Sequence, residues 1–410
     1  MQNISSNPFT PGAGHMPPHL AGREPEITLF RKLLRQHTIC ENLLLTGLRG
    51  VGKTVLLEAL KPVALQEKWG WVGSDLSESA SVSEATIAQR ILTDLSLVSA
   101  GLTFRRSRKP GVGFSSPAAV TTQRFDYRTL QSIYEGTPGL IADKIKNALM
   151  RVWGAMSQQA PDRKGIIFAY DEAQTMCDHP QERQYPLSML LDIFQSIQRT
   201  RVPFMLALTG LPTLFPKLIE ARTYSERMFR VVSLSVLSKD ECKDAITKPV
   251  ANMAHAPLYF TDESVKTITN HSGGYPYFIQ FICREVYDVW MNAPGPGTAV
   301  EQNLSVTMEG ITRKLDADFF AGRWAQLTDR QRELLTVVAL IDSGDGEFSV
   351  QEVVAQSKVV LSNAFSPSHA NQMLSALSQR GLIYKNRHGK YSFAVPLMGQ
   401  FVRRQRGEAG

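Results

Sequence analysis

The sequence predicts an α/β protein with a doubly wound parallel sheet, followed by a helical region and a C-terminal winged helix-turn-helix. Strand patterns alternate with helix patterns from about residue 40 to residue 235, which is typical of a parallel sheet covered on both faces. A glycine-rich loop with a phosphate-binding pattern separates the first strand from its helix. From about residue 325 onward, three helical patterns precede a hairpin pattern, which is the order of a winged helix-turn-helix.

The composition is that of a soluble globular protein with more than one domain. The chain has 410 residues, of which 43% are hydrophobic and 20% are charged. It has no apolar run of the roughly 18 to 20 residues that cross a bilayer, no secretory signal pattern, and four widely spaced cysteines. We therefore expect a cytoplasmic protein with reduced cysteines and no membrane contact. The net charge of +7 permits nucleic-acid contact but does not require it.

The first segments predict an arm, a helix and a strand. Residues 1–20 combine four prolines with glycine, serine and asparagine, which indicates an extended arm rather than a packed element. A helix is predicted from Arg23 and Glu24 onward, with Pro25 in its first turn. The apolar segment from residue 42 to residue 46 then predicts a buried strand.

Residues 47–54 fit the pattern G-x-x-x-x-G-K-[ST] at every constrained position. The glycines let successive backbone N–H groups point into one cavity, and the N-terminus of the following helix adds positive potential. Lys53 is expected to reach the β- and γ-phosphates of ATP, and the Thr54 hydroxyl is expected to hold Mg²⁺. The alternative is a chance glycine-rich turn, which the flanking strand and helix disfavour. The residues predicted to bind ATP in this phosphate loop are Gly47, Leu48, Arg49, Gly50, Val51, Gly52, Lys53, Thr54 and Val55.

A strand at residues 70–76 and a helix are predicted next. Ser81 and Glu84 have capping-box spacing, which predicts a helix that runs to about Val98.

The segment of about residues 100–125 is predicted to be a basic insertion. Five basic residues and no acidic residue lie between Leu95 and Phe125. The favoured interpretation is a solvated surface loop. The second interpretation is a flexible arm that contacts a nucleic-acid phosphate backbone through Arg105 and Arg106.

Two acidic residues follow the apolar strand predicted at residues 165–170. Ligands bind at the carboxyl ends of strands in a doubly wound sheet. Asp171 is therefore positioned to hold Mg²⁺ through water, and Glu172 to polarise the attacking water as a general base. The pair favours hydrolysis over nucleotide binding alone. Thr209 is a polar residue near the end of the strand predicted at residues 202–210, and helices are predicted at residues 141–157 and 186–199.

The predicted winged helix-turn-helix has a polar third helix and a basic wing. The helices are predicted at residues 327–341, 348–357 and 367–380, and the wing surrounds residues 386–390. Such side chains suit entry into a DNA groove and contacts with phosphates. The third helix is not strongly basic, so protein docking remains open as an alternative. The candidate nucleic-acid contacts in this domain are Asn371, Gln372, Arg387 and Lys390.

These motifs together resemble the AAA+ superfamily of P-loop ATPases. Four segments carry the resemblance, which spans about residues 7–290: residues 20–24, 47–54, 171–174 and 208–212. Within the superfamily, the chain is similar to bacterial ATPases of the archaeal-ATPase, origin-recognition and STAND-like group. The patterns and the resemblance together predict three domains after the arm: an ATPase core at residues 21–237, a helical lid at residues 238–321 and, from the order of helices and hairpin, a winged helix at residues 325–406.

The resemblance also implies roles for single residues. Arg23 belongs to the segment that lies by the adenine base, and Thr209 takes the sensor-1 position near the γ-phosphate or the lytic water. Pro276 belongs to a G-x-P element at the start of a lid helix. Arg227 matches an arginine finger that enters a neighbouring subunit, with Arg222 as a competing candidate, which implies self-association.

Three functions remain open at this stage. The first is an ATP-hydrolysing AAA+ switch that acts on double-stranded DNA through its winged helix, as a homo-oligomer. The second is a STAND-like signalling ATPase that regulates a separate effector protein and uses the winged helix for packing. The third, a nucleotide-binding scaffold without turnover, is disfavoured by Glu172.

Overall fold

The computed structural model describes residues 7–12, 14–36, 38–77, 79, 81–107, 120–251, 259–291, 308–341, 346–387 and 389–407. The chain packs as two compact units, which we describe separately. The sheet unit comprises Glu24–Thr46 and Leu56–Ser233. The helical unit comprises Met1–Arg23, Gly47–Val55 and Leu234–Gly410, and thus includes the phosphate loop.

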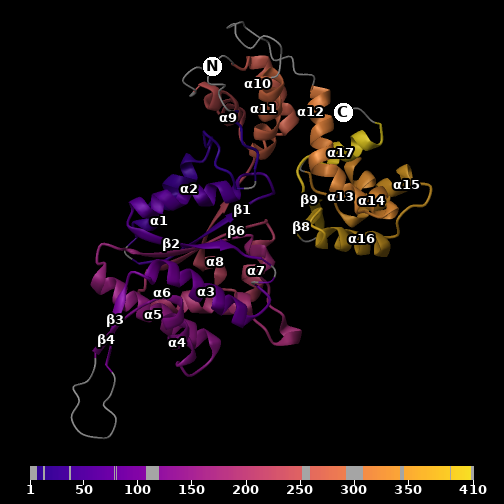
Figure 1. Ribbon diagram of the computed structural model, residues 1–410. Coiled ribbons are helices and arrows are strands. Elements are labelled where there is room, and N and C mark those ends of the chain that lie inside the picture. The colour runs from indigo at the N-terminus through magenta and orange to yellow at the C-terminus, as the bar shows by residue number, and fades with distance from the viewer. Residues whose placement is uncertain are drawn as a thin grey trace, which may run out of the picture. The chain divides into compact units, whose positions relative to one another are not determined.

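The sheet unit contains a five-stranded sheet with the strand order β2-β5-β6-β1-β7, in which every neighbouring pair is parallel. Figure 1 shows α1 and α2 on one face of this sheet and α3, α5 and α6 on the other. The predicted doubly wound α/β fold is therefore confirmed. The elements are α1 (Glu24–Leu34), β1 (Asn42–Thr46), α2 (Lys53–Gln66, with its first turn in the helical unit), β2 (Trp69–Asp75), α3 (Glu84–Ser99), β3 (Thr103–Ser107), β4 (Val120–Arg124), α4 (Tyr127–Glu135), α5 (Ile141–Gln159), β5 (Gly165–Asp171), the 3₁₀ turns Ala173–Thr175 and Pro180–Glu182, α6 (Pro186–Arg199), β6 (Phe204–Gly210), α7 (Leu214–Ala221), α8 (Ser225–Met228) and β7 (Phe229–Ser233).

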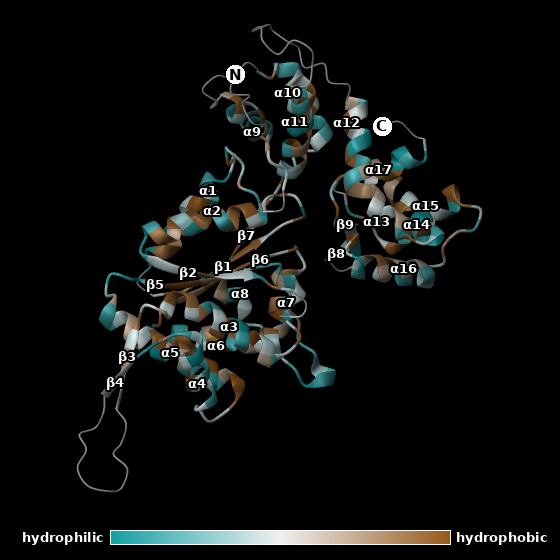
Figure 2. Cartoon of the chain, in the orientation of Figure 1, coloured by the Kyte–Doolittle hydropathy of each residue, from teal (hydrophilic) through white to brown (hydrophobic). Residues whose placement is uncertain are grey.

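The three central strands account for the apolar runs in the sequence. Every residue of β1, β5 and β6 is buried, whereas the edge strands β2 and β7 contain exposed or half-buried residues. Figure 2 shows much of these strands in the brown of hydrophobic residues. A parallel strand with helices on both faces has no solvent side, so its sequence is a continuous apolar run rather than an alternating one.

The start of α3 differs from the prediction. The capping box consists of Ser83 and Thr86, and Ser83 is the N-cap. The predicted pair, Ser81 and Glu84, does not form it. Ser81 lies outside the helix and donates its hydroxyl to the backbone C=O of Ser77 at 2.7 Å.

The basic insertion was predicted as a loop, but its two flanks form an antiparallel hairpin of β3 and β4. Phe104 in β3 packs against Phe125 with 4.8 Å between ring centroids, so an aromatic contact closes the base of the hairpin. The residues between the strands, 108–119, lie outside the described part of the chain. Helix α4 and strand β7 were not predicted either.

The helical unit confirms that the chain becomes helical after the sheet. Its elements are α9 (Lys239–Ala251), α10 (Asp262–Ser272), α11 (Pro276–Met291), α12 (Met308–Leu315), a π-helical turn (Asp316–Phe320), α13 (Ala321–Ala325), α14 (Asp329–Ala339), α15 (Val350–Val360), α16 (Pro367–Gln379), β8 (Ile383–Arg387), β9 (Lys390–Phe393) and α17 (Met398–Gln405). The three helices α14, α15 and α16 and the antiparallel β8–β9 pair follow the predicted order. A winged helix-turn-helix remains our interpretation of this order. Within the described ranges, none of the helices has the length and apolarity to cross a membrane.

The N-terminal arm is packed, contrary to the prediction of an extended arm. Phe9 is 1% exposed and meets Phe260 and Tyr287 edge to face, with ring centroids 6.0 Å and 6.5 Å away. Asn7 Nδ2 donates hydrogen bonds to the backbone C=O of Arg284 and to Asp288 Oδ1. The described residues of the arm form no helix or strand. Phe9 and the hydrogen bonds of Asn7 therefore anchor a segment whose composition indicates a loop.

Asn42 joins three elements of the sheet unit from a fully buried position in β1. Its Oδ1 accepts hydrogen bonds from the backbone N–H of Leu206 and from Gln198 Nε2, both at 2.8 Å. Its Nδ2 donates to the backbone C=O of Met228 at 3.2 Å. The side chain thus satisfies buried polar groups that the strands themselves do not pair.

Asn42→Ala should lower the free energy of unfolding of the sheet unit by about 2–4 kcal/mol, because Leu206 N–H and Met228 C=O would be buried without this partner. Urea denaturation of the full chain measures the loss. The matched control is Asn270→Ala on the exposed face of α10, which should change stability by less than about 0.5 kcal/mol. An equal effect of the two changes would contradict the role given to Asn42.

Candidate functional site

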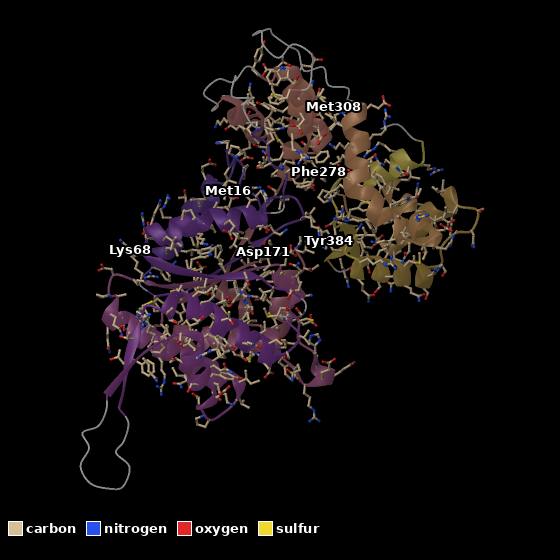
Figure 3. All side chains as sticks on the ribbon, in the orientation of Figure 1. Met16, Lys68, Asp171, Phe278, Met308 and Tyr384 are labelled. Carbon is tan, nitrogen blue, oxygen red and sulfur yellow. The ribbon has the colours of Figure 1, made fainter. Side chains whose placement is uncertain are left out.

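The carboxyl ends of β5 and β6 bring Asp171 and Thr209 together. Tyr170 pairs with Leu208 in parallel register. The residues that follow them, Asp171 and Thr209, therefore both lie at the carboxyl ends of the strands. Asp171 is 3% exposed and Thr209 is fully buried, and the Thr209 hydroxyl donates a hydrogen bond to Asp171 Oδ1. Figure 3 labels Asp171 at this edge and Lys68, which precedes β2, at the opposite edge. The strand ends therefore hold a carboxylate and a hydroxyl in a buried pair.

Glu172 leaves the strand in a left-handed backbone conformation, with φ 52° and ψ 32°. This conformation costs a residue with a β-carbon roughly 1–2 kcal/mol. Its backbone N–H donates to Asp171 Oδ1 at 2.7 Å, while its side chain is exposed and accepts a hydrogen bond from Gln174 Nε2. Strain at a residue beside a buried acid is typical of functional sites. The sequence carries no signal of this turn.

The phosphate loop precedes α2, whose first three residues are Lys53, Thr54 and Val55. Lys53 is 6% exposed, and its Nζ donates to the backbone C=O of Leu48 at 3.0 Å. Gly50 and Gly52 have φ values of 79° and 90°, a region that side chains disfavour. The positive φ values therefore explain why the pattern has glycine at these two positions.

Arg23, the residue before α1, is buried and contacts the phosphate loop. Its Nη2 donates to the backbone C=O of Val51 at 2.9 Å and to that of Ser235 at 3.1 Å. A guanidinium with two carbonyl partners fixes the backbone of the loop. The resemblance implies a place for Arg23 by the adenine base, and these contacts with the loop were not predicted.

Pro276 is the first residue of α11 and lies next to a loop contact. The backbone N–H of Tyr277 donates to the C=O of Gly50 at 3.3 Å. Proline at the first helical position has no N–H to offer, so the second residue of the helix provides the donor.

The two finger candidates differ in their partners. Arg222 forms two hydrogen bonds to Asp192, at 2.8 Å and 2.6 Å, and a third to Ser188 Oγ at 2.9 Å. Burial raises the pKa of Asp192, but the hydrogen bonds from Arg222 and Tyr224 outweigh it and hold that pKa below its usual value. Arg227 is exposed in α8, and its side chain has no hydrogen bond or ion pair within the described ranges. Of the two candidates, Arg227 is thus the one whose charge is not neutralised by a partner in the described part of the sheet unit.

The nucleic-acid candidates are only partly described. Asn371 and Gln372 are exposed on α16, where Asn371 Oδ1 lies 3.4 Å from the hydroxyl of Tyr391. Lys390 forms an ion pair with Glu352 at 3.0 Å, which reduces its charge toward other partners. The side chains of Arg105, Arg106 and Arg387 lie outside the described part of the chain, although their backbones belong to β3 and β8.

Comparisons with known proteins give two domain matches in this chain. Residues 19–216 match the family profile of the AAA ATPase domain, and residues 317–402 match a domain of unknown function (DUF8462). The comparison with curated proteins gave no match.

Among solved structures, the fold is similar to that of the ORC2 protein of Aeropyrum pernix. The ADP form has 13% identity and a TM-score of 0.57, and the match covers 98% of each chain. The ADPNP-ADP complexes have 13% identity and a TM-score of 0.53, with 97% of this chain and 98% of that chain covered. The ORC1 protein of the same organism, in complex with DNA, has 14% identity and a TM-score of 0.45 and covers 95% and 94%. Residues 19–216 thus match an AAA ATPase domain, and the fold with its parallel sheet is similar to that of the ORC2 protein.

Proposed function

We propose that the protein hydrolyses ATP at the carboxyl edge of its sheet and works as a nucleotide-gated switch. The observation that carries the proposal is the buried Asp171–Thr209 pair, followed directly by the exposed carboxylate of Glu172. The phosphate loop directly follows Thr46, the last residue of β1, in the chain. In the sheet, only β6 lies between β1 and β5. Parallel strands lie about 4.8 Å apart, so the two strand ends are separated by about 10 Å. The match to the AAA ATPase domain supports the same reaction.

Each residue has a distinct task in this proposal. The loop amides and Lys53 bind the phosphates, and a hydroxyl from Thr54 with a carboxylate from Asp171 would hold Mg²⁺, which prefers such oxygen ligands. The buried, hydrogen-bonded Asp171 fits that task, and the ion would screen the negative charge of the phosphates. Glu172 accepts a proton from the attacking water and orients it toward the γ-phosphate. Thr209 fixes the carboxylate of Asp171 through its hydroxyl.

Lys53→Ala and Glu172→Gln should separate binding from turnover. Lys53→Ala should lose ATP binding, because a buried ammonium no longer meets the phosphates. Glu172→Gln should keep the wild-type affinity and lose about a hundredfold or more of the rate, because the amide accepts no proton. Titration with a fluorescent ATP analogue and release of phosphate measure the two effects. Glu135→Gln, an exposed change on α4, is the control. A wild-type rate of ATP hydrolysis in Glu172→Gln would contradict the proposed role of Glu172 as general base.

Self-association is the second part of the proposal. Arg227 is exposed and has no partner in the described ranges, so its charge is available to a neighbouring subunit. Arg222, which is already bound to Asp192, is the weaker candidate. An arginine that enters the neighbour's site would offset the charge that develops on the phosphates during transfer.

A mixing experiment tests whether Arg227 acts between subunits. Arg227→Ala and Glu172→Gln should each lose most of the ATPase rate, up to about a thousandfold for the arginine. An equal mixture should recover activity, because a subunit that keeps Glu172 then receives Arg227 from its neighbour. Phosphate release and mass in solution with ATP provide the readouts. If the mixture is no more active than either variant alone at concentrations where complexes form, Arg227 is not a finger in trans.

DNA is the proposed partner of the C-terminal domain. The support is the polar surface of α16, where Asn371 and Gln372 are exposed and Leu374 and Leu377 face the core. A helix with this division can enter a groove while its apolar side stays packed. The alternative is a STAND-like switch that regulates a separate effector and uses the domain for packing. The Lys390–Glu352 ion pair favours that alternative, because it neutralises a wing lysine.

Added negative charge on α16 distinguishes these two functions. The double change Asn371→Asp with Gln372→Glu should weaken binding to double-stranded DNA at least tenfold, because two carboxylates would approach the phosphates. Fluorescence anisotropy over a range of salt concentrations measures it. The control Gln89→Glu with Thr93→Glu adds the same charge to exposed positions of α3. Absence of salt-dependent binding by the wild-type protein would instead support the effector function.

A further inference from the structure

We propose that Gln174 is a positioning residue that holds the carboxylate of Glu172 and connects it to the end of β6. The inference rests on the proposed role of Glu172 as general base. It adds a residue whose side chain touches neither the phosphates nor the metal ligands in the proposed mechanism.

The side-chain amide of Gln174 is bonded at both ends. Its Nε2 donates a hydrogen bond to Glu172 Oε2, and its Oε1 accepts one from the backbone N–H of Leu211 at 3.0 Å. The backbone C=O of Gln174 accepts a further bond from Lys217 Nζ at 2.8 Å. One residue thus joins the segment after β5 to the segment after β6 and to α7.

The end of β6 leaves room for this amide only because residue 210 is glycine. A β-carbon at Gly210 would lie 2.6 Å from Gln174 Oε1 and 2.7 Å from Leu214 Cδ2. Both distances are shorter than β-carbons tolerate, so any side chain at this position would displace the amide oxygen. This close packing of the Gln174 amide against Gly210 is an observation separate from the hydrogen bonds, and it indicates that the Gln174 side chain occupies a defined position.

Glu172 requires a partner because its own surroundings restrain it little. The side chain is exposed and can rotate about three torsions. A general base, however, must stay within hydrogen-bond reach of the water that it activates. A bond to Oε2 fixes the carboxylate group and directs its other oxygen, Oε1, to the water.

The same contacts make Glu172 respond to the strand that carries Thr209. Leu211 follows Thr209 by two residues, and the Thr209 hydroxyl is bonded to Asp171. When the end of β6 shifts, Leu211 N–H shifts with it, and so does the amide that holds the base. The position of Glu172 therefore depends on the position of the β6 end.

Only glutamine fits both contacts. Its amide donates to a carboxylate and accepts from an N–H at the same time. A glutamate at residue 174 would place a second negative charge against Glu172, and asparagine is one methylene shorter. Methionine has a similar length but makes neither hydrogen bond.

Gln174→Met in the full chain tests the proposal. We expect kcat for ATP to fall about tenfold to a hundredfold, whereas KM and the Kd of ADP change by less than about twofold, because misplacement of a base lowers the rate without removing phosphate contacts. The matched control is Gln131→Met on α4, which removes a similar bond, from Gln131 Nε2 to Glu135 Oε1 at 2.9 Å. That variant should keep the wild-type kcat.

A double-mutant cycle separates positioning from a structural role. In the Glu172→Gln background, Gln174→Met should cause no further loss of the residual rate, because two residues that act through one another are not additive. Gly210→Ala should reproduce the kcat loss of Gln174→Met by displacing the amide. A further loss in the double variant that matches the single one would overturn the inference.

The outcomes also distinguish the inference from the proposed function. A wild-type kcat in Gln174→Met, together with a large loss in Glu172→Gln, overturns the role of Gln174 and leaves the general base intact. A wild-type kcat in Glu172→Gln overturns the base itself, and the inference with it.

Discussion

The parallel pairing of β5 with β6 is the constraint on which the rest of the site depends. The pairing of Tyr170 with Leu208 fixes the edge at which Asp171 and Thr209 meet. Both side chains are buried there, and a buried carboxylate is stable only with hydrogen-bond donors around it. The hydroxyl of Thr209 and the N–H of Glu172 are two such donors. A slip of one residue between these strands would bring an apolar side chain to Asp171 and turn Thr209 to the other face of the sheet.

The sequence predicts the parts of the fold that are local. The apolar strands, the loop pattern and the helix at residues 186–199 each follow from neighbouring residues, and the structure contains β1, β5, β6 and α6 at these places. The hairpin of β3 and β4 was missed because its pairing joins residues that a basic segment separates. Composition alone favours a loop for such a segment, whereas the contact of Phe104 with Phe125 is visible only in three dimensions.

The site follows the same division. Asp171, Glu172 and Lys53 are expected as site residues because each lies at a strand end or within a motif, and the resemblance implies the place of Thr209; their roles stay proposals. The left-handed turn at Glu172 and the bond from Gln174 could not be predicted, since no residue at these positions is diagnostic of them. The buried contacts of Arg23 depend on Val51 and Ser235, which lie far from it in the chain. The sequence motifs therefore do not predict these hydrogen bonds, which become visible only in the three-dimensional structure.

Phe9 makes the short N-terminal segment important for the stability of the helical unit. Its ring fills a space between Phe260 and Tyr287, and loss of a buried phenylalanine side chain typically costs about 3–5 kcal/mol. Arg23, which follows this segment, donates a hydrogen bond to the backbone of the phosphate loop. Removal of the Phe9 side chain would thus open a void among the aromatic rings of the helical unit. Residues 7–10 therefore form part of the packed helical unit.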